Sequence, residues 1–68
     1  MTFCETLKKG KTPEGCEVYA VREMDKYSAV WRYSVDFVEN GVCFHSVKCA
    51  RTTWKKRFEE AEEGRYGF

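Results

Sequence analysis

The chain has 68 residues, which is enough for one domain with one core and one or two working surfaces. It is too short to enclose a cofactor cavity on all sides, so no cofactor and no small-molecule substrate is expected. Its 12 basic and 11 acidic residues give a net charge of +1, which argues against a dedicated polyanion-binding protein. The 43% hydrophobic and 16% aromatic content indicates a folded domain rather than a disordered one.

The N-terminal stretch "MTFCETLKKG" lacks the apolar run of a signal peptide, and no stretch approaches the length of a membrane span. We therefore expect a cytoplasmic protein without a membrane partner, in which the four cysteines are reduced. "KKGKTPEG" is typical of a turn-rich connector. Residues 1–15 are thus expected to form an N-terminal segment and connector, in which Phe3 and Leu7 lie on one side of a short helical turn. Residues 16–68 are expected to form a single domain.

Three strands are predicted in the first part of that domain. "CEVYAVREM" from Cys16 and "SAVWRYSVDFVE" from Ser28 are rich in β-branched and aromatic residues, with a polar turn between them. Asn40-Gly41 then predicts a tight hairpin into a third strand, "VCFHSVKC".

A helix is predicted over "TTWKKRFEEAEEG", begun by Thr52 or Thr53 and ended by Gly64. Its stripe of Trp54, Phe58 and Ala61 has helical spacing. The fold class predicted is therefore α+β, a three-stranded antiparallel meander followed by one C-terminal helix on one sheet face.

The turns also predict which residues face each other. With Asp25-Lys26 as the first turn, Ala20 is opposite Trp31. With Asn40-Gly41 as the second turn, Phe37 is opposite Phe44 and Asp36 is opposite His45. Because side chains alternate between the faces of a sheet, one face is mostly apolar and is the predicted core face. It carries Cys16, Val18, Ala20, Met24, Ala29, Trp31, Tyr33, Val35, Phe37, Val42 and Phe44.

Two cysteines and the only histidine lie within "VCFHSVKC", which raises the possibility of a metal or catalytic site. Cys43 and Cys49 are about 20 Å apart along an extended strand, too far for a disulfide. The spacing of zinc ligands is absent, and the chain contains no Cys-x-x-Cys. Asp36, His45 and Cys43 resemble the components of an activated nucleophile, but no oxyanion site or walled pocket accompanies them. We therefore expect neither a metal site nor catalysis, and read the stretch as a strand.

Two surfaces remain as candidates for function. The back of the sheet is expected to hold several apolar residues around one arginine, which is typical of an interaction surface. Its candidate protein-binding residues are Tyr19, Val21, Val30, Arg32, Val38, His45 and Val47. The alternative is that the N-terminal segment covers this face. The second surface is the helix start, where basic residues oppose the helix dipole and can meet an anionic partner. The nucleic-acid-binding candidates are Arg32, Arg51, Lys55, Lys56 and Arg57.

The strand-strand-strand-helix order over about residues 16–63 resembles small DNA-binding domains that use a sheet. Examples are the arm-binding domain of some integrases and plant AP2-type domains. Those domains carry many arginines and lysines on the sheet face, whereas the back face expected here offers only Arg32 with acids nearby. The function expected first is therefore a small non-enzymatic protein-interaction module that binds a protein partner or itself, as a homodimer, through the back of the sheet. Nucleic-acid binding is the second hypothesis, and an inhibitor of a host protein encoded by a phage or mobile element is the third.

Overall fold

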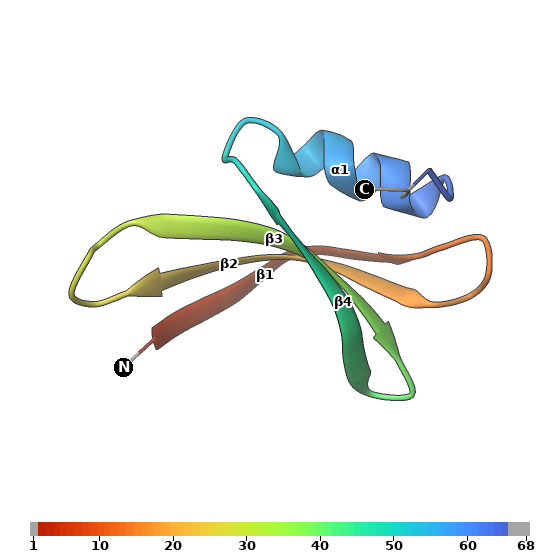
Figure 1. Ribbon diagram of the computed structural model, residues 1–68, viewed down its shortest axis with the longest axis horizontal. Coiled ribbons are helices and arrows are strands. Elements are labelled where there is room, and N and C mark those ends of the chain that lie inside the picture. Colours follow the sequence, from red (N-terminus) through yellow and green to blue (C-terminus); the bar gives the residue numbers. More distant parts are fainter. Residues whose placement is uncertain (1, 66–68) are drawn as a thin grey trace.

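The computed structural model describes residues 2–65, without the side chain of Thr2. It shows four strands in the order β1-β2-β3-β4, all antiparallel, followed by one helix (Figure 1). The elements are β1 (Thr2–Lys11), β2 (Glu17–Asp25), β3 (Trp31–Glu39), β4 (Val42–Cys49) and α1 (Trp54–Glu62). The α+β class and the C-terminal helix on the sheet are confirmed, whereas the count of three strands is wrong by one.

The additional strand is β1, in the segment where the sequence predicted a helical turn. It pairs along β2 from Thr2 opposite Asp25 to Lys11 opposite Glu17. The register shifts once, between Thr6 and Lys8, so that Leu7 is an extra residue that packs against the core. The predicted helical turn around Phe3 and Leu7 is therefore wrong, and the N-terminal segment does not fold over the back of the sheet. It extends the sheet sideways instead.

The hairpin between β2 and β3 has a longer loop than expected. Ala20 lies opposite Val35 rather than Trp31, because five residues, 26–30, separate the two strands. The Asp25 carboxylate accepts a hydrogen bond from the Tyr27 amide at 2.8 Å, and Ala29 has a positive φ of 54° within the loop. The difference from the predicted register is an even number of residues, so the side chains of the two strands keep their predicted faces. The prediction of Ala29 on the core face is wrong, because Ala29 lies exposed in the longer loop.

The hairpin between β3 and β4 has the predicted two-residue turn, in which Asn40 and Gly41 both have positive φ. Beyond it the prediction fails at one residue. Val38 lies opposite Cys43 as expected, but Phe37 lies opposite His45, so Phe44 is an extra residue in β4. A one-residue shift exchanges the faces of every later side chain in the strand. The predicted pairs Phe37–Phe44 and Asp36–His45 are therefore wrong.

The core lies between α1 and one face of the sheet, which we continue to call the core face. Its fully buried members are Val18, Ala20, Val35, Phe37, Phe58 and Ala61. The helix lies over one face of the sheet and packs on β2, β3 and β1 (Figure 1). Phe58 and Ala61 are its buried residues, and Trp54 packs against the same core. Ala20 and Gly10 leave the space that brings the helix close to the strands, since a Cβ at Gly10 would lie 3.3 Å from the Phe58 ring.

The two ends of α1 have different local chemistry. Thr53 is the N-cap residue just before the helix, but its hydroxyl makes no capping bond to the helix. It lies 3.0 Å from the Ala50 amide nitrogen and 3.3 Å from the Ala50 carbonyl oxygen, which ties the helix start to the end of β4. At the other end Gly64 has a φ of 80°, and the amides of Gly64 and Arg65 donate to the carbonyls of Ala61 and Glu60. This is a Schellman motif, and it explains why Gly64 ends the helix.

Candidate protein-interaction surface

The core face is divided into rows of side chains that run across the strands. The outermost row is Phe3, Met24 and Trp31, and the next contains Glu5, Arg22 and Tyr33. Trp54 of α1 stacks on Tyr33 with nearly parallel rings, 6.5 Å between centroids, so the helix begins above that second row. Figure 1 shows α1 over the other half of the sheet, away from the loop between β2 and β3. The Phe3–Met24–Trp31 row therefore continues the apolar core face beyond the part that the helix covers.

We call this uncovered region the aromatic end. It consists of Phe3, Met24 and Trp31 on the strands, together with Tyr27 and Val30 of the adjoining loop. Phe3 is 60% exposed, Tyr27 83% and Val30 57%, and Met24 and Trp31 are half-buried. Phe3, Tyr27 and Val30 are three of the five large hydrophobic side chains that are exposed in the described part of the chain. The other two, Val42 and Phe44, lie at the β3–β4 hairpin.

Arg22 holds the aromatic end in place. The Phe3 ring meets the Trp31 ring edge-to-face at 6.0 Å, and the Arg22 guanidinium lies 4.0 Å from the centre of the Trp31 ring. Arg22 also donates to Glu5 Oε2 from Nε at 3.0 Å and from Nη2 at 2.8 Å. These bonds to Glu5 raise the pKa of Arg22, because they stabilise the charged form. The result is an aromatic platform with two cations beside its rings: Arg22, which is paired with Glu5, and Lys26, whose Nζ lies 5.1 Å from the centre of the Tyr27 ring.

The back face is more polar than the sequence indicated. His45 and Val47, predicted to lie there, face the core side instead, because the extra residue Phe44 exchanges the faces of β4. His45 is exposed beside the Phe37 ring at 5.4 Å, and Val47 packs against the core. Val30 lies in the loop before β3.

The remaining predicted residues do lie on the back face, but polar neighbours separate the apolar ones. Val21 lies between Thr6 and Ser34, and Tyr19 lies between Lys9 and Asp36. The Tyr19 hydroxyl donates to Glu17, and this bond raises the pKa of Tyr19. The back of the sheet thus has the alternation typical of a solvated face.

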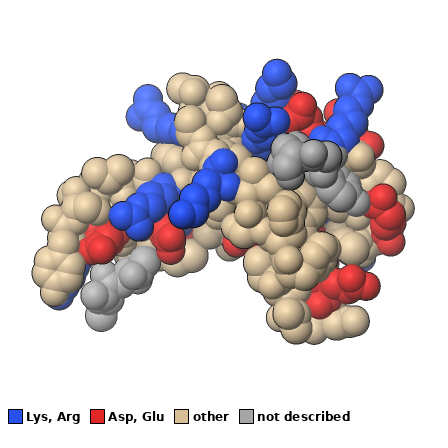
Figure 2. Space-filling view, viewed as in Figure 1, with Lys and Arg blue, Asp and Glu red and all other residues tan. Residues whose placement is uncertain are grey.

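The basic residues of the second hypothesis do not form one site. Arg32 projects from the back of the sheet, opposite α1, as shown by its pairing with Glu23 rather than with a core residue. Arg51, Lys55 and Lys56 are exposed at the helix start, where Lys55 Nζ lies 5.7 Å above the Trp54 ring. Arg57 pairs with Glu60 at 3.3 Å. Figure 2 shows basic side chains along the upper and left parts of the molecule with acidic ones among them, and further acidic ones at the right and lower right.

The cysteine-histidine stretch forms an edge strand. Asp36 lies opposite Ser46 and accepts a hydrogen bond from its hydroxyl at 2.6 Å, whereas His45 is on the other face. Residues 2–65 contain no cluster of three or more metal-ligating side chains.

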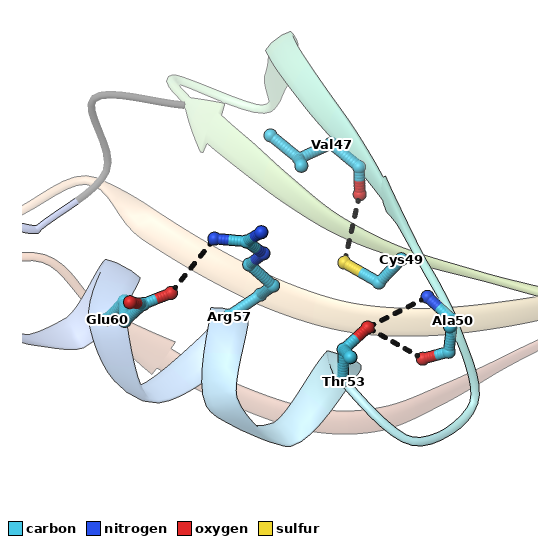
Figure 3. A network of polar contacts seen from close by, with 6 residues as sticks. All are labelled: Val47, Cys49, Ala50, Thr53, Arg57 and Glu60. Atoms are coloured by element: carbon cyan, nitrogen blue, oxygen red, sulfur yellow. Dashed lines mark hydrogen bonds and ion pairs between the residues drawn. The ribbon is translucent and has the colours of Figure 1, made fainter.

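Cys49 lies on the side of β4 that faces α1, and its thiol approaches the Val47 carbonyl oxygen at 3.5 Å (Figure 3). Burial raises the pKa of the Cys49 thiol, and the nearby Arg57 guanidinium opposes this shift.

Comparison with protein-family models, with curated proteins and with solved structures gave no match. Of the described residues, no helix has the length and apolar character needed to cross a membrane. The function proposed for this chain therefore rests on its fold and its exposed surfaces.

Proposed function

We propose that this chain is a small, non-enzymatic protein-interaction module that binds a protein partner through the aromatic end. The observation that carries this proposal is that the Phe3–Met24–Trp31 row continues the core face outside the cover of α1. An apolar patch next to polar groups is a recurring feature of binding surfaces, and it costs solubility unless something uses it.

The chemistry of the aromatic end favours a protein over a polyanion. Tryptophan, tyrosine and arginine are the residues most enriched among those that dominate binding energy in protein interfaces. Trp31 and Arg22 are already ordered by their mutual stacking at 4.0 Å, which lowers the entropy lost on binding. Arg22 is paired with Glu5 at 2.8 Å, so its charge is less available to a phosphate backbone.

Selection from a displayed library of random peptides tests the proposal, since binding surfaces of this composition generally capture apolar peptides. We expect selected peptides to shift the amide signals of Phe3, Met24 and Trp31 in ¹⁵N NMR spectra. Tyr27→Ser and Phe3→Ser should weaken these peptides at least tenfold, since each removes an exposed ring. Val42→Ser is the matched control, because Val42 is 64% exposed at the opposite hairpin. Peptides that bind elsewhere, or that bind both ring variants like the parent, would contradict the proposal.

A second candidate, single-stranded nucleic-acid binding, is favoured by one specific arrangement. Trp54, which stacks on the buried Tyr33, and Lys55 form an aromatic and cationic surface at the helix start, and Lys56 follows them as a further exposed cation. Aromatic side chains beside cations suit stacked bases and their phosphates. Fluorescence anisotropy of a labelled oligonucleotide would detect it. Lys55→Ala and Lys56→Ala should each reduce the slope of log affinity against log salt by about one unit. The absence of binding at low salt would remove this candidate.

A further inference from the structure

The strand β4 forms an open edge of the sheet. It pairs with β3 on one side only, and no other described strand lies beside it. Val42, Cys43, Phe44, His45, Ser46 and Lys48 are all exposed. An edge strand leaves a row of backbone amide and carbonyl groups unpaired, and these groups form a template for another strand. β4 is eight residues long, which is sufficient for stable pairing.

The other edge, β1, has features that discourage such pairing. It carries Lys8, Lys9 and Lys11 within four residues, and the extra residue Leu7 interrupts its register. Lysines and irregularities are the devices by which natural edge strands avoid association. β4 has its irregularity at Phe44, close to the turn, so that His45–Cys49 forms an unbroken stretch. That stretch contains one lysine and no acid. The two edges are therefore not equivalent, and β4 is the one suited to a partner strand.

The inner side of β4 is also incompletely covered. The helix packs mainly on β1, β2 and β3, and beyond it Val47 and Cys49 remain half-buried on the core face. Figure 3 shows both residues on the side of β4 next to the start of α1, and the Arg57 side chain extends from the helix towards them. A strand added beside β4 would shield Val47 further only if it brought apolar side chains to the same face.

We propose that a second copy of this chain occupies the edge, with the two β4 strands antiparallel and Val47 opposite Val47 of that copy. In this register His45 lies opposite Cys49 and Ser46 opposite Lys48, so no two like charges face each other. A two-fold axis perpendicular to the sheet generates the pair and keeps both core faces on the same side. The product is a continuous eight-stranded sheet in which the two Val47 side chains pack between the two helices. The inference does not depend on the aromatic end, because no residue of β4 belongs to the Phe3–Met24–Trp31 row.

The Ser46–Lys48 pairing gives a charge test that is specific to this register. Sedimentation velocity of the full chain, from micromolar to millimolar concentration, should show a dimer. Ser46→Lys should weaken it roughly 2- to 30-fold, because two symmetry-related lysine pairs then face each other. Adding Lys48→Glu to Ser46→Lys should restore the dimer. Inside one copy Ser46→Lys removes the hydrogen bond to Asp36 but places a lysine opposite that acid, and recovery of the dimer by Lys48→Glu then excludes misfolding as the cause of weaker association.

Two variants serve as matched controls. Thr6→Lys adds the same charge to an exposed position of the β1 edge and should leave the dimer unchanged. Phe3→Ser should also leave it unchanged, although it weakens binding at the aromatic end, so failure of either proposal can be recognised separately. A parent chain that remains monomeric at millimolar concentration would overturn the inference. So would a dimer that Ser46→Lys does not weaken, or one that either control variant disrupts.

Discussion

Replacing Phe58 by alanine tests how the helix is attached to the sheet. Phe58 is fully buried in the core cluster with Val18, Val35 and Phe37, and its ring fills the space above Gly10. Truncating a buried phenylalanine removes its transfer free energy and leaves a cavity, at a cost of about 3–5 kcal/mol. A domain of 68 residues has a total unfolding free energy of roughly 3–10 kcal/mol, by the usual value per residue. Phe58→Ala should therefore remove from about a third to all of the unfolding free energy.

Urea denaturation followed by far-ultraviolet circular dichroism measures the effect, and Phe44→Ala is the matched control. Phe44 is 56% exposed, with its ring centre 6.4 Å from that of the buried Phe37, so its truncation should cost about 1 kcal/mol. The difference between two identical substitutions then reports burial alone. Equal losses for Phe58→Ala and Phe44→Ala would refute the packing of α1 on the sheet.

Gly64→Ala should lower the unfolding free energy by about 1 kcal/mol in the same assay, because Gly64 has a φ of 80° that a β-carbon disfavours. Gly10→Val should lower it by about 1–3 kcal/mol, since the added atoms meet the Glu62 carboxylate and press on the buried Phe58 ring, and an unchanged midpoint would contradict the close approach of α1 to β1. Exposed Cys43 should react with a thiol reagent faster than Cys49, whose raised pKa leaves less thiolate at a given pH. Equal reaction rates of Cys43 and Cys49 with the thiol reagent in the folded chain would contradict this expectation.

The strands from β2 onward, the tight turn at Asn40-Gly41 and the helix could be predicted from the sequence, because each has a local signal. Alternating apolar residues in "EVYAVREM" and "WRYSVDFVE" select one face regardless of the loop between them. An error of four residues in the β2–β3 register consequently left the core assignment of Val18, Ala20 and Val35 intact. The apolar spacing of Trp54, Phe58 and Ala61 and the terminating Gly64 are likewise local signals, because all of them lie within or next to one helix.

β1 could not be recognised, because its sequence has little strand character of its own. "TFCETLKKGK" contains three lysines and a glycine, and only Phe3 and Leu7 are large apolar residues. Their spacing of four fits one side of a helix, but it is also even and so fits one face of a strand. In the structure the second reading holds, and Leu7, at the register shift, packs against the core. Pairing with the whole length of β2 stabilises the strand, and such a partner is not visible locally.

The predicted positions of His45 and Val47 were wrong because of a single extra residue in β4, Phe44. The side chains of a strand alternate with a period of two, so one extra residue moves all later ones to the opposite face. "VCFHSVKC" alternates equally well in either phase, and the turn at Asn40-Gly41 favours the phase in which His45 and Val47 lie on the back. The structure selects the other phase, in which the valine meets the core and Ser46 bonds to Asp36. The choice is set by burial of Val47 beside Val35, a contact between residues twelve positions apart. Because Val47 lies on the core face and not on the back of the sheet, the apolar surfaces still open to a partner are the aromatic end beyond α1 and the edge of β4.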